Sequence, residues 1–342
     1  MSAESHYLDA LEALESNDVD LAIENAKKTV QVDPEHVDAW NLLSDLYLLN
    51  QTNPSLQRAA QSLSALKKAL ELDPERLDLW VRGGRLLADD LGLLHDALKW
   101  WQNCRHIAPN EVTPIVEQAS ILADMGEYEL SRQRLETILN ENMDVATSQF
   151  AKINGLLRLV RAAQDQDRKD IFRPQEKNHN AWKAIEYKMK KPPVSENYIF
   201  LLSTVPFLFL IVISSQRFAG DGWTAFCFTS LVILMAVLFG VRFSRKMFQV
   251  ANRPAFNLLR AMNFEASTGF VVISEDIRTS VLYMYIMQRK PQAWQERMLR
   301  IIEAGKQLPS SWKLSLPDFD SHLEELIEDD DEEKDFSAYE EE

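Results

Sequence analysis

Apolar residues in the first 145 positions recur every three or four residues, the period of an α-helix, and this pattern is interrupted at regular places. The interruptions are the phrases VDPEHVDAW (32–40) and LDPERLDLW (72–80), followed by a weaker copy, IAPNEVTPI (107–115). Proline lacks the amide donor that a helix needs and restricts the residue before it. Each phrase therefore predicts the end of one helix and the start of the next, with two helices in each repeat.

The residues that recur resemble the tetratricopeptide family, whose pattern is W-x2-L-G-x2-Y, then A-x3-F, then P. One repeat matches at Trp40, Leu43, Ser44, Tyr47 and Pro74, with an insertion at 50–54; the next at Trp80, Gly83, Gly84, Leu87, Ala97, Trp101 and Pro109; a further one at Ile115, Gln118, Ala119, Leu122, Gly126, Tyr128, Ser131 and Leu135. Ala10 and Ala22 fit a degenerate first repeat. The resemblance covers residues 3–145.

A solenoid of helical hairpins needs a polar-faced helix to close its end. Residues 150–164 (FAKINGLLRLVRAAQ) fit that role, so we expect a repeat solenoid with a capping helix over residues 1–170.

In the tetratricopeptide family, the first helix of each repeat lines a groove that takes peptides, and the resemblance implies the same here. The matching residues are Glu4, Tyr7, Leu11 and Glu15, then Asp38, Asn41, Asp45 and Leu48, then Asp78, Val81, Arg85 and Asp89, and finally Val116, Ser120 and Asp124. This surface is acidic with apolar patches. Charge complementarity therefore favours basic or basic–amphipathic protein partners; the alternative is an ordinary solvated face.

Members of the family that bind the acidic C-termini of heat-shock chaperones use Lys, Asn and Arg at five groove positions. The matching residues here are Tyr7, Leu11, Leu42, Asp78 and Arg82. Four of these five do not suit a carboxylate, so we do not expect that kind of partner.

Two apolar runs, 198–215 and 223–241, contain no charged residue. Each is 27–29 Å long as a helix, close to the roughly 30 Å of a bilayer's hydrocarbon core. They predict a transmembrane hairpin over residues 198–241; a pair of buried helices in a soluble core is the alternative. The flanks are basic, at Lys188, Lys190, Lys191, Arg242, Arg245 and Lys246. The positive-inside rule then predicts an integral, two-pass protein with both termini in the cytoplasm.

The segments on either side of the hairpin are harder to interpret. Residues 171–197 are basic and contain Pro192-Pro193, and we expect a linker there. Residues 242–313 predict a juxtamembrane helical region. Its first part, 242–264, mixes basic and aromatic residues, which suits either an anionic membrane surface or a small helical domain that packs on itself.

The net charge of −15 argues against nucleic acid as a partner, because phosphates require a basic surface. Twelve acidic residues and one lysine lie between Glu324 and Glu342. Such a run repels itself, so we expect residues 314–342 to form a disordered acidic tail. The tail is either solubilising or an attractant for basic partners.

Catalytic chemistry has no candidate in this sequence. There is no phosphate-binding glycine loop and no H-E-x-x-H or G-x-S-x-G motif, so we expect no enzyme activity, no cofactor and no metal site. The two cysteines, Cys104 and Cys227, lie far apart and form no disulfide framework. His95 and His106 fall on a repeat helix, where structural roles are more common. The N-terminal residues also lack a signal peptide pattern.

These expectations combine into an all-α protein with a tetratricopeptide-type solenoid, two transmembrane helices and a C-terminal helical segment. The function that this predicts is a membrane-anchored adaptor or scaffold that binds protein partners at the cytoplasmic face of a membrane. Two other functions fit the same pattern: an accessory subunit of a multi-subunit membrane complex, and a membrane-shaping hairpin protein.

Overall fold

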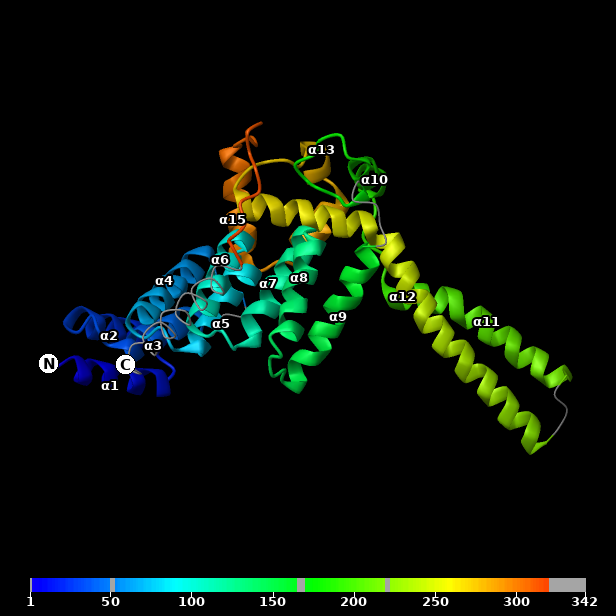
Figure 1. The fold of residues 1–342 in the computed structure, drawn as a ribbon, viewed down its shortest axis with the longest axis horizontal. Helices are drawn as coiled ribbons and strands as arrows, with labels where there is room; N and C mark the ends of the chain where they lie inside the picture. The colour runs from blue at the N-terminus through cyan, green and yellow to red at the C-terminus, as the bar shows by residue number, and fades with distance from the viewer. Residues whose placement is uncertain (1, 50–52, 165–169, 219–221, 320–342) are drawn as a thin grey trace, which may run out of the picture. The chain divides into compact units, whose positions relative to one another are not determined.

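The computed structural model describes residues 2–49, 53–164, 170–218 and 222–319, and this part of the chain is all-α (Figure 1). Its helices fall into two compact units. We call residues 1–175, 260–272 and 289–342 the repeat domain, and residues 176–259 and 273–288 the hairpin domain. The sequence predicted the fold class correctly.

Consecutive helical hairpins build the repeat domain, as the interrupted pattern predicts (Figure 1). Each helix packs against the next one along the chain, and α9 covers the last pair. The helices are α1 (Ala3–Glu15), α2 (Val19–Val32), α3 (Val37–Leu48), α4 (Leu56–Leu72), α5 (Leu77–Arg85), the π-helical turn η1 (Leu86–Asp90), α6 (Leu94–Ile107), α7 (Val112–Met125), α8 (Tyr128–Asn140) and α9 (Thr147–Gln164).

The repeated phrase forms a closed turn. The Trp40 indole N–H donates to the backbone oxygen of Pro34 (2.9 Å), and Trp80 donates to that of Pro74 (2.8 Å). His36 Nδ1 accepts the backbone N–H of Ala39 and so caps α3. The tryptophan therefore locks the turn that precedes its own helix, which explains why proline and tryptophan recur at a fixed spacing.

The glycine pair of the third repeat makes room for two tryptophans from α6. A Cβ atom added at Gly83 would clash with the Trp100 ring, and one added at Gly84 would clash with the Trp101 ring. Trp101 is 1 % exposed. Close approach of α5 to α6 thus depends on the absence of side chains at these two positions.

The repeat domain also takes in residues from the C-terminal third. α15 (Gln292–Ala304) packs against α4, where Glu296 accepts the backbone N–H of Leu56 (2.9 Å). Phe319 is buried, and the Arg134 guanidinium lies 4.9 Å from its ring centroid. The separate region predicted for 242–313 is therefore divided between the two domains. Of the predicted tail, residues 314–319 are ordered by such contacts, and 320–342 lie outside the described residues.

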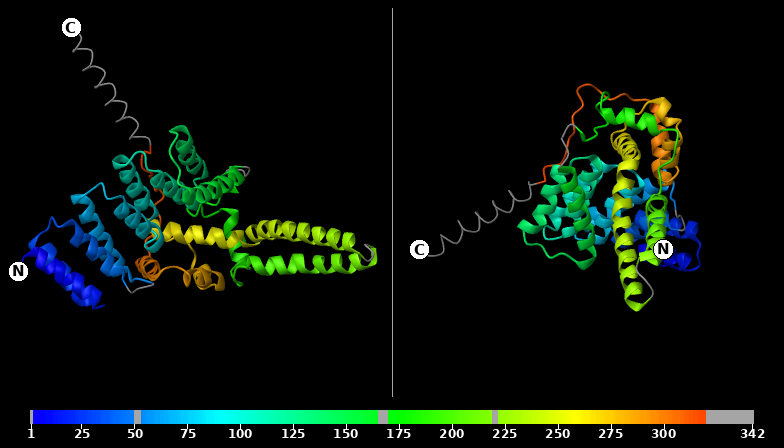
Figure 2. Two further views of the ribbon diagram at one scale, coloured as in Figure 1. Left: turned by 90° about the horizontal axis from the view of Figure 1, so that it is seen from below. Right: turned by 90° about the vertical axis from the view of Figure 1, so that its right-hand side faces the viewer.

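The hairpin domain centres on two long antiparallel helices, which lie side by side in both views of Figure 2. Its helices are α10 (Asn180–Lys188), α11 (Glu196–Phe218), α12 (Trp223–Thr268, whose last turns belong to the repeat domain), α13 (Glu275–Arg278) and α14 (Val281–Met287). α12 does not stop where the apolar run ends at Val241, but continues as one helix.

Residues 171–197, expected to be a linker, contain α10 and a turn like those of the repeats. The Trp182 indole N–H donates to the backbone oxygen of Glu176 (3.1 Å), six residues earlier, and His179 caps the helix at Ala181. The sequence pattern did not predict this turn, because it has glutamate at the position where the repeats have proline.

Candidate functional site

The predicted groove residues lie on α1, α3, α5, η1 and α7 of the repeat domain, and we call this set the first-helix face. Asp38, Asp78 and Asp89 are exposed, as are Glu4, Glu15, Arg85 and Asp124, and Tyr7, Leu11, Asn41, Asp45, Leu48, Val81 and Ser120 are half-buried. Val116 is 2 % exposed and packs with Leu135 and Ile138 of α8. Val116 therefore contributes to the core and cannot contact a partner, because α7 turns this side toward α8.

Side chains of the second and third repeats reach back to acids of the repeat before them. His36 Nε2 lies 3.7 Å from a Glu4 oxygen, and the Arg76 guanidinium lies 3.6 Å from an Asp38 oxygen. His36 and Arg76 occupy the same place in the repeated phrase, immediately before the first helix of their repeat. In the third copy Glu111 takes that place, so this series of ion pairs ends there.

Arginine also neutralises part of the middle of the first-helix face. Arg82 donates to Asn41 Oδ1 (2.9 Å) and forms an ion pair with Asp45, which joins α5 to α3. Burial raises the pKa of Asp45 despite the opposing charge of Arg82. Arg76 also donates to both carboxylate oxygens of Asp78 (3.0 Å each), and this bond lowers the pKa of Asp78.

The face is consequently less negative than the sequence alone suggests. Asp38 and Asp78 share Arg76, and Asp45 is paired with Arg82. Glu15 and Asp89 form no ion pair with the part of the chain that the structure describes. These two carboxylates are therefore available to a basic partner, although burial raises the pKa of Asp89 and the charges of Lys152, Arg85 and Lys290 already act on it.

At the other end of the face, cations come from distant parts of the sequence. Lys290 donates to Asn263 Oδ1 (3.1 Å) and lies 5.1 Å from the Trp294 ring centroid. Burial lowers the pKa of Lys290, while the charges of Asp124 and Asp89 oppose that shift. No local pattern marks Lys290 as part of this surface, because it comes close only through the packing of the C-terminal helices on the repeats.

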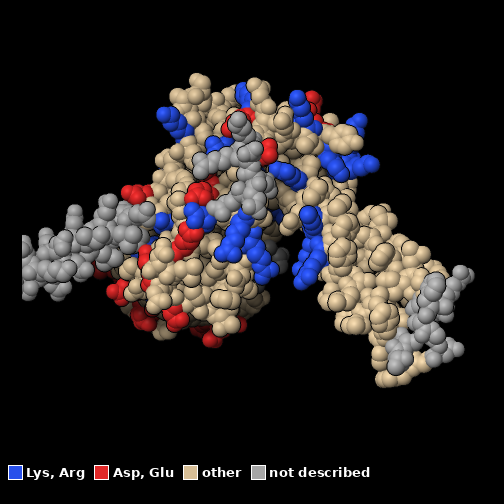
Figure 3. Space-filling view, turned by 45° about the vertical axis from the view of Figure 1, so that its right-hand side comes forward, with Lys and Arg blue, Asp and Glu red and all other residues tan. Residues whose placement is uncertain are grey.

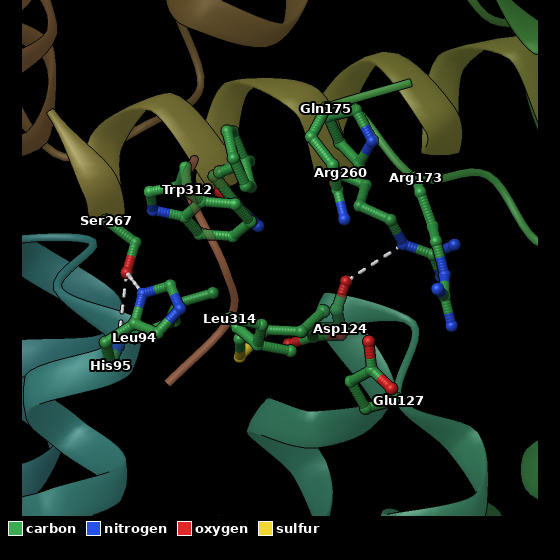
Figure 4. Close-up of a pocket in the computed structure, with 14 residues that line it drawn as sticks. Leu94, His95, Asp124, Glu127, Arg173, Gln175, Arg260, Ser267, Trp312 and Leu314 are labelled. Carbon is green, nitrogen blue, oxygen red and sulfur yellow. Dashed lines mark hydrogen bonds between the residues drawn. The ribbon is translucent and has the colours of Figure 1, made fainter. Parts of the chain in front are cut away.

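Arg260 of α12 clasps the turn between α7 and α8. Its guanidinium donates to the Asp124 backbone oxygen (3.0 Å) and to the Tyr128 hydroxyl (2.5 Å), and lies 5.4 Å from the Tyr128 ring centroid (Figure 4). Gly126, at φ +89°, lies directly against it: an added Cβ would come within 3.1 Å of the guanidinium. Glycine is therefore required here for both its backbone conformation and its size.

A small pocket lies beside Arg260, with His95 and Ser267 at one end and Asp124, Glu127 and Arg173 at the other (Figure 4). Its volume is about 30 Å³, which is of the order of one water molecule. Ser267 Oγ lies 2.5 Å from His95 Nδ1 and accepts the His95 backbone N–H (3.1 Å). This pair joins α6 to α12.

A wider groove of about 690 Å³ lies between α4 and α6, the second helices of their repeats. Its walls are mixed: Trp80, Trp100 and Leu63 lie beside charged residues of both signs, such as Lys67 and Asp96. The expectation of a groove on the first helices did not include it. Two glycines and two adjacent tryptophans in one repeat are the signal in the sequence that could have drawn attention to it.

The hairpin domain carries a second candidate surface. α11 and α12 are long and apolar enough to span a membrane, and only 6 % of the most apolar window of each is buried. Large side chains such as Phe209 (67 % exposed) and Phe239 (69 % exposed) point away from the protein. On the face seen in Figure 3, the tan surface of the hairpin carries no charged side chain.

The two helices of the hairpin hold each other through small and polar residues. Thr204 is 3 % exposed and lies against Gly240, where any Cβ would clash with it. At the base, Asn252 accepts the backbone N–H of Val194 (2.9 Å) and donates to its backbone oxygen (2.8 Å). Polar groups are thus satisfied inside the hairpin, while apolar groups cover its outside.

Comparison with known proteins gives no relative to guide the functional assignment: the sequence matches no protein-family model and no curated protein.

Proposed function

We propose that this chain is a membrane-anchored adaptor, in which the hairpin domain crosses a bilayer and the repeat domain binds protein partners at the cytoplasmic face. The observation that carries the proposal is the exposed apolar surface of α11 and α12 in a chain whose repeat domain is well packed and charged. Each Å² of apolar surface removed from water is worth about 25 cal/mol. Contiguous apolar surface of this extent requires an apolar environment.

The repeats support an assignment to the tetratricopeptide type. Each has two helices, with small residues where helices cross, such as Ala10, Ala22, Gly83 and Gly84, all of them buried. Stacks of such hairpins present extended surfaces and commonly bind protein segments. The free carboxylates Glu15 and Asp89 favour a basic or amphipathic partner.

Membrane insertion is tested by alkaline extraction of native membranes together with labelling of the hairpin tip. A two-pass protein with cytoplasmic termini stays in the membrane pellet, and a cysteine placed at position 220 reacts with an impermeant reagent added outside. Release of the chain at high pH would refute anchoring. Retention without labelling from outside would replace the spanning hairpin with one that enters a single leaflet, as in a membrane-shaping protein.

Partner binding is tested by in-cell cross-linking and purification of the full chain in mild detergent. The variant Glu15→Lys plus Asp89→Lys reverses the two free carboxylates without disturbing Arg76 or Arg82. Its matched control, Asp20→Lys plus Asp96→Lys, reverses two exposed acids on α2 and α6. We expect partners to be lost with the first variant and kept with the control. Partners that survive both variants in fixed ratio would identify a complex subunit instead.

A further inference from the structure

Charge is divided unevenly between the two domains. The hairpin domain contains eleven Lys or Arg and six Asp or Glu, a net charge of +5, whereas the rest of the chain contains 26 and 46, a net charge of −20. Figure 3 shows blue side chains where the uncharged hairpin begins. The hairpin domain is thus the net positive part of an acidic protein.

Five cations lie near the base of the apolar hairpin, and we call them the basic collar: Lys190, Lys191, Arg242, Arg245 and Lys246. All five are exposed. Arg245 lies 3.4 Å from Glu196. Lys190, Lys191, Arg242 and Lys246 form no ion pair with any carboxylate in the described part of the chain.

The helix geometry sets the depth of these cations. Arg242 directly follows the apolar run that ends at Val241, and Arg245 and Lys246 lie one turn further along α12. At 1.5 Å per residue, these three residues fall within about 8 Å of the end of the run. The headgroup layer on one side of a bilayer is about 5–8 Å thick. They would therefore lie at headgroup level.

The two lysines of the collar lie on a segment that is fixed at both ends. Asn252 holds both backbone polar groups of Val194, and the Met189 backbone oxygen accepts the N–H of Leu282 (3.1 Å). Between these anchors, Lys190 and Lys191 project from a short restrained segment. Binding a ligand to these lysines therefore loses less conformational entropy than binding it to a mobile loop would.

Exposed aromatic residues accompany the collar. Tyr187 is 87 % exposed, Tyr198 59 % and Phe243 42 %. Aromatic side chains are enriched at membrane–water interfaces, where an apolar ring and a polar edge are both accommodated. Their position beside the cations extends the interface continuously from the apolar hairpin to the charged base.

From this arrangement we propose that the basic collar binds anionic phospholipid headgroups, so that the protein selects a negatively charged membrane surface. The inference rests on the proposed anchoring of the hairpin and adds the lipid class that the anchor prefers. Charge complementarity carries it: lysine and arginine near an anionic surface are attracted to it, and the acidic remainder of the chain would be repelled by the same surface.

The test uses the full chain in neutral detergent micelles. Phosphatidylglycerol and phosphatidylcholine with the same acyl chains are added in equal amounts, and the lipids retained on the protein are counted by native mass spectrometry. We expect the wild type to retain the anionic lipid at least about fivefold over the zwitterionic one. The preference should decrease as salt is raised, because exposed charges are screened.

The variant Lys190→Gln, Lys191→Gln, Arg242→Gln, Lys246→Gln should reduce this preference to near one. Arg245 is kept because it contacts Glu196. The matched control replaces four exposed cations of the repeat domain, Lys67, Lys99, Arg158 and Arg161, with glutamine and should leave the preference unchanged. A wild type without preference, or a control that loses as much as the collar variant, would overturn the inference.

Two further outcomes separate the possible failures. A wild-type chain that is released from native membranes at high pH refutes the anchoring itself, whereas a chain that is retained but shows no lipid preference refutes the lipid class alone. Displacement of the bound lipid by soluble glycerol phosphate would also overturn the proposal, because it would show a phosphate pocket rather than a membrane surface.

Discussion

Trp101 in the repeat domain and Trp223 in the hairpin domain are both tryptophans, but their surroundings are opposite. Trp101 is 1 % exposed and fills the space left by Gly84, whereas Trp223 is 78 % exposed and stacks on Phe226, with ring centroids 5.7 Å apart. The repeat domain buries its apolar side chains in its own core. The hairpin domain turns such side chains outward, so its stability depends on what surrounds it.

The largest effect should come from truncating the buried member of this pair. Trp101→Ala removes a ring around which α5 and α6 are packed and should lower the free energy of unfolding by about 3–5 kcal/mol. Trp223→Ala removes a ring that contributes little to the protein's own core, and should change it by less than about 0.5 kcal/mol. Chemical unfolding of the full chain in detergent, followed by circular dichroism, measures both. Equal losses would show that the two domains do not differ in this way.

Leucines of similar exposure sharpen the comparison. Leu234 of α12 is 55 % exposed and Leu159 of α9 is 48 % exposed. If lipid surrounds the first and water the second, Leu234→Lys should cost about 3–4 kcal/mol of insertion free energy. Leu159→Lys should change stability by less than about 0.5 kcal/mol.

The fraction of each variant that resists alkaline extraction measures this difference. Leu234→Lys should shift a large fraction of the chain out of the membrane pellet, and Leu159→Lys should not. Unchanged retention of Leu234→Lys would contradict a bilayer around α12.

The two domains also differ in how much the sequence could predict. Periodicity and the Asp-Pro breaks predicted the repeat helices, because breaks and apolar stripes are local properties. The uncharged runs likewise predicted two long apolar helices. The continuation of α12 beyond Val241 was missed because no apolar run marks it and Pro254 lies within it. The turn at Trp182 was missed because glutamate replaces the proline of the repeats.

The chemistry of the first-helix face was predictable only in part. The carboxylates Asp38, Asp45 and Asp78 could be placed from the repeat spacing, but their pairing with Arg76 and Arg82 could not, since it depends on side-chain directions between repeats. Lys290 reaches the face from far along the chain. Long-range packing of this kind leaves no periodic trace in a single sequence.

A moderate effect is expected at the base of the hairpin. Asn252 is 3 % exposed and bonds both backbone groups of Val194. Asn252→Ala would leave a backbone donor and acceptor without these partners, at a cost of about 1–3 kcal/mol. Hydrogen exchange at the Val194 amide should become about 5- to 150-fold faster.

The control for this variant is Asn154→Ala on α9. Asn154 donates to the Phe150 backbone oxygen at an exposed site (3.0 Å), where water can replace it. Its removal should leave Val194 exchange unchanged. If Asn252→Ala also left the exchange rate unchanged, the bonds between Asn252 and Val194 would not be what holds the two helices together.

The smallest effect should come from breaking the ion pair between Arg82 and Asp45 on the first-helix face of the repeat domain. Both side chains are partly exposed, so Arg82→Gln should cost only about 0.2–1 kcal/mol at neutral pH.

The pH dependence of the Arg82→Gln effect is more informative. Burial holds the folded-state pKa of Asp45 above its ordinary value, and Arg82 opposes that shift. Without Arg82 the pKa should rise further. The folded state then binds more protons than the unfolded state, and stability falls as pH rises through the interval between the two pKa values. The deficit of Arg82→Gln against the wild type should therefore be smaller at pH 4 than at pH 7, as measured by chemical unfolding of the full chain at both values. When Asp45 is replaced by Asn in both proteins, position 45 cannot titrate. The deficit caused by Arg82→Gln should then be the same at pH 4 and pH 7. A deficit for Arg82→Gln that is independent of pH would show that Arg82 stabilises the repeats by packing rather than by its charge.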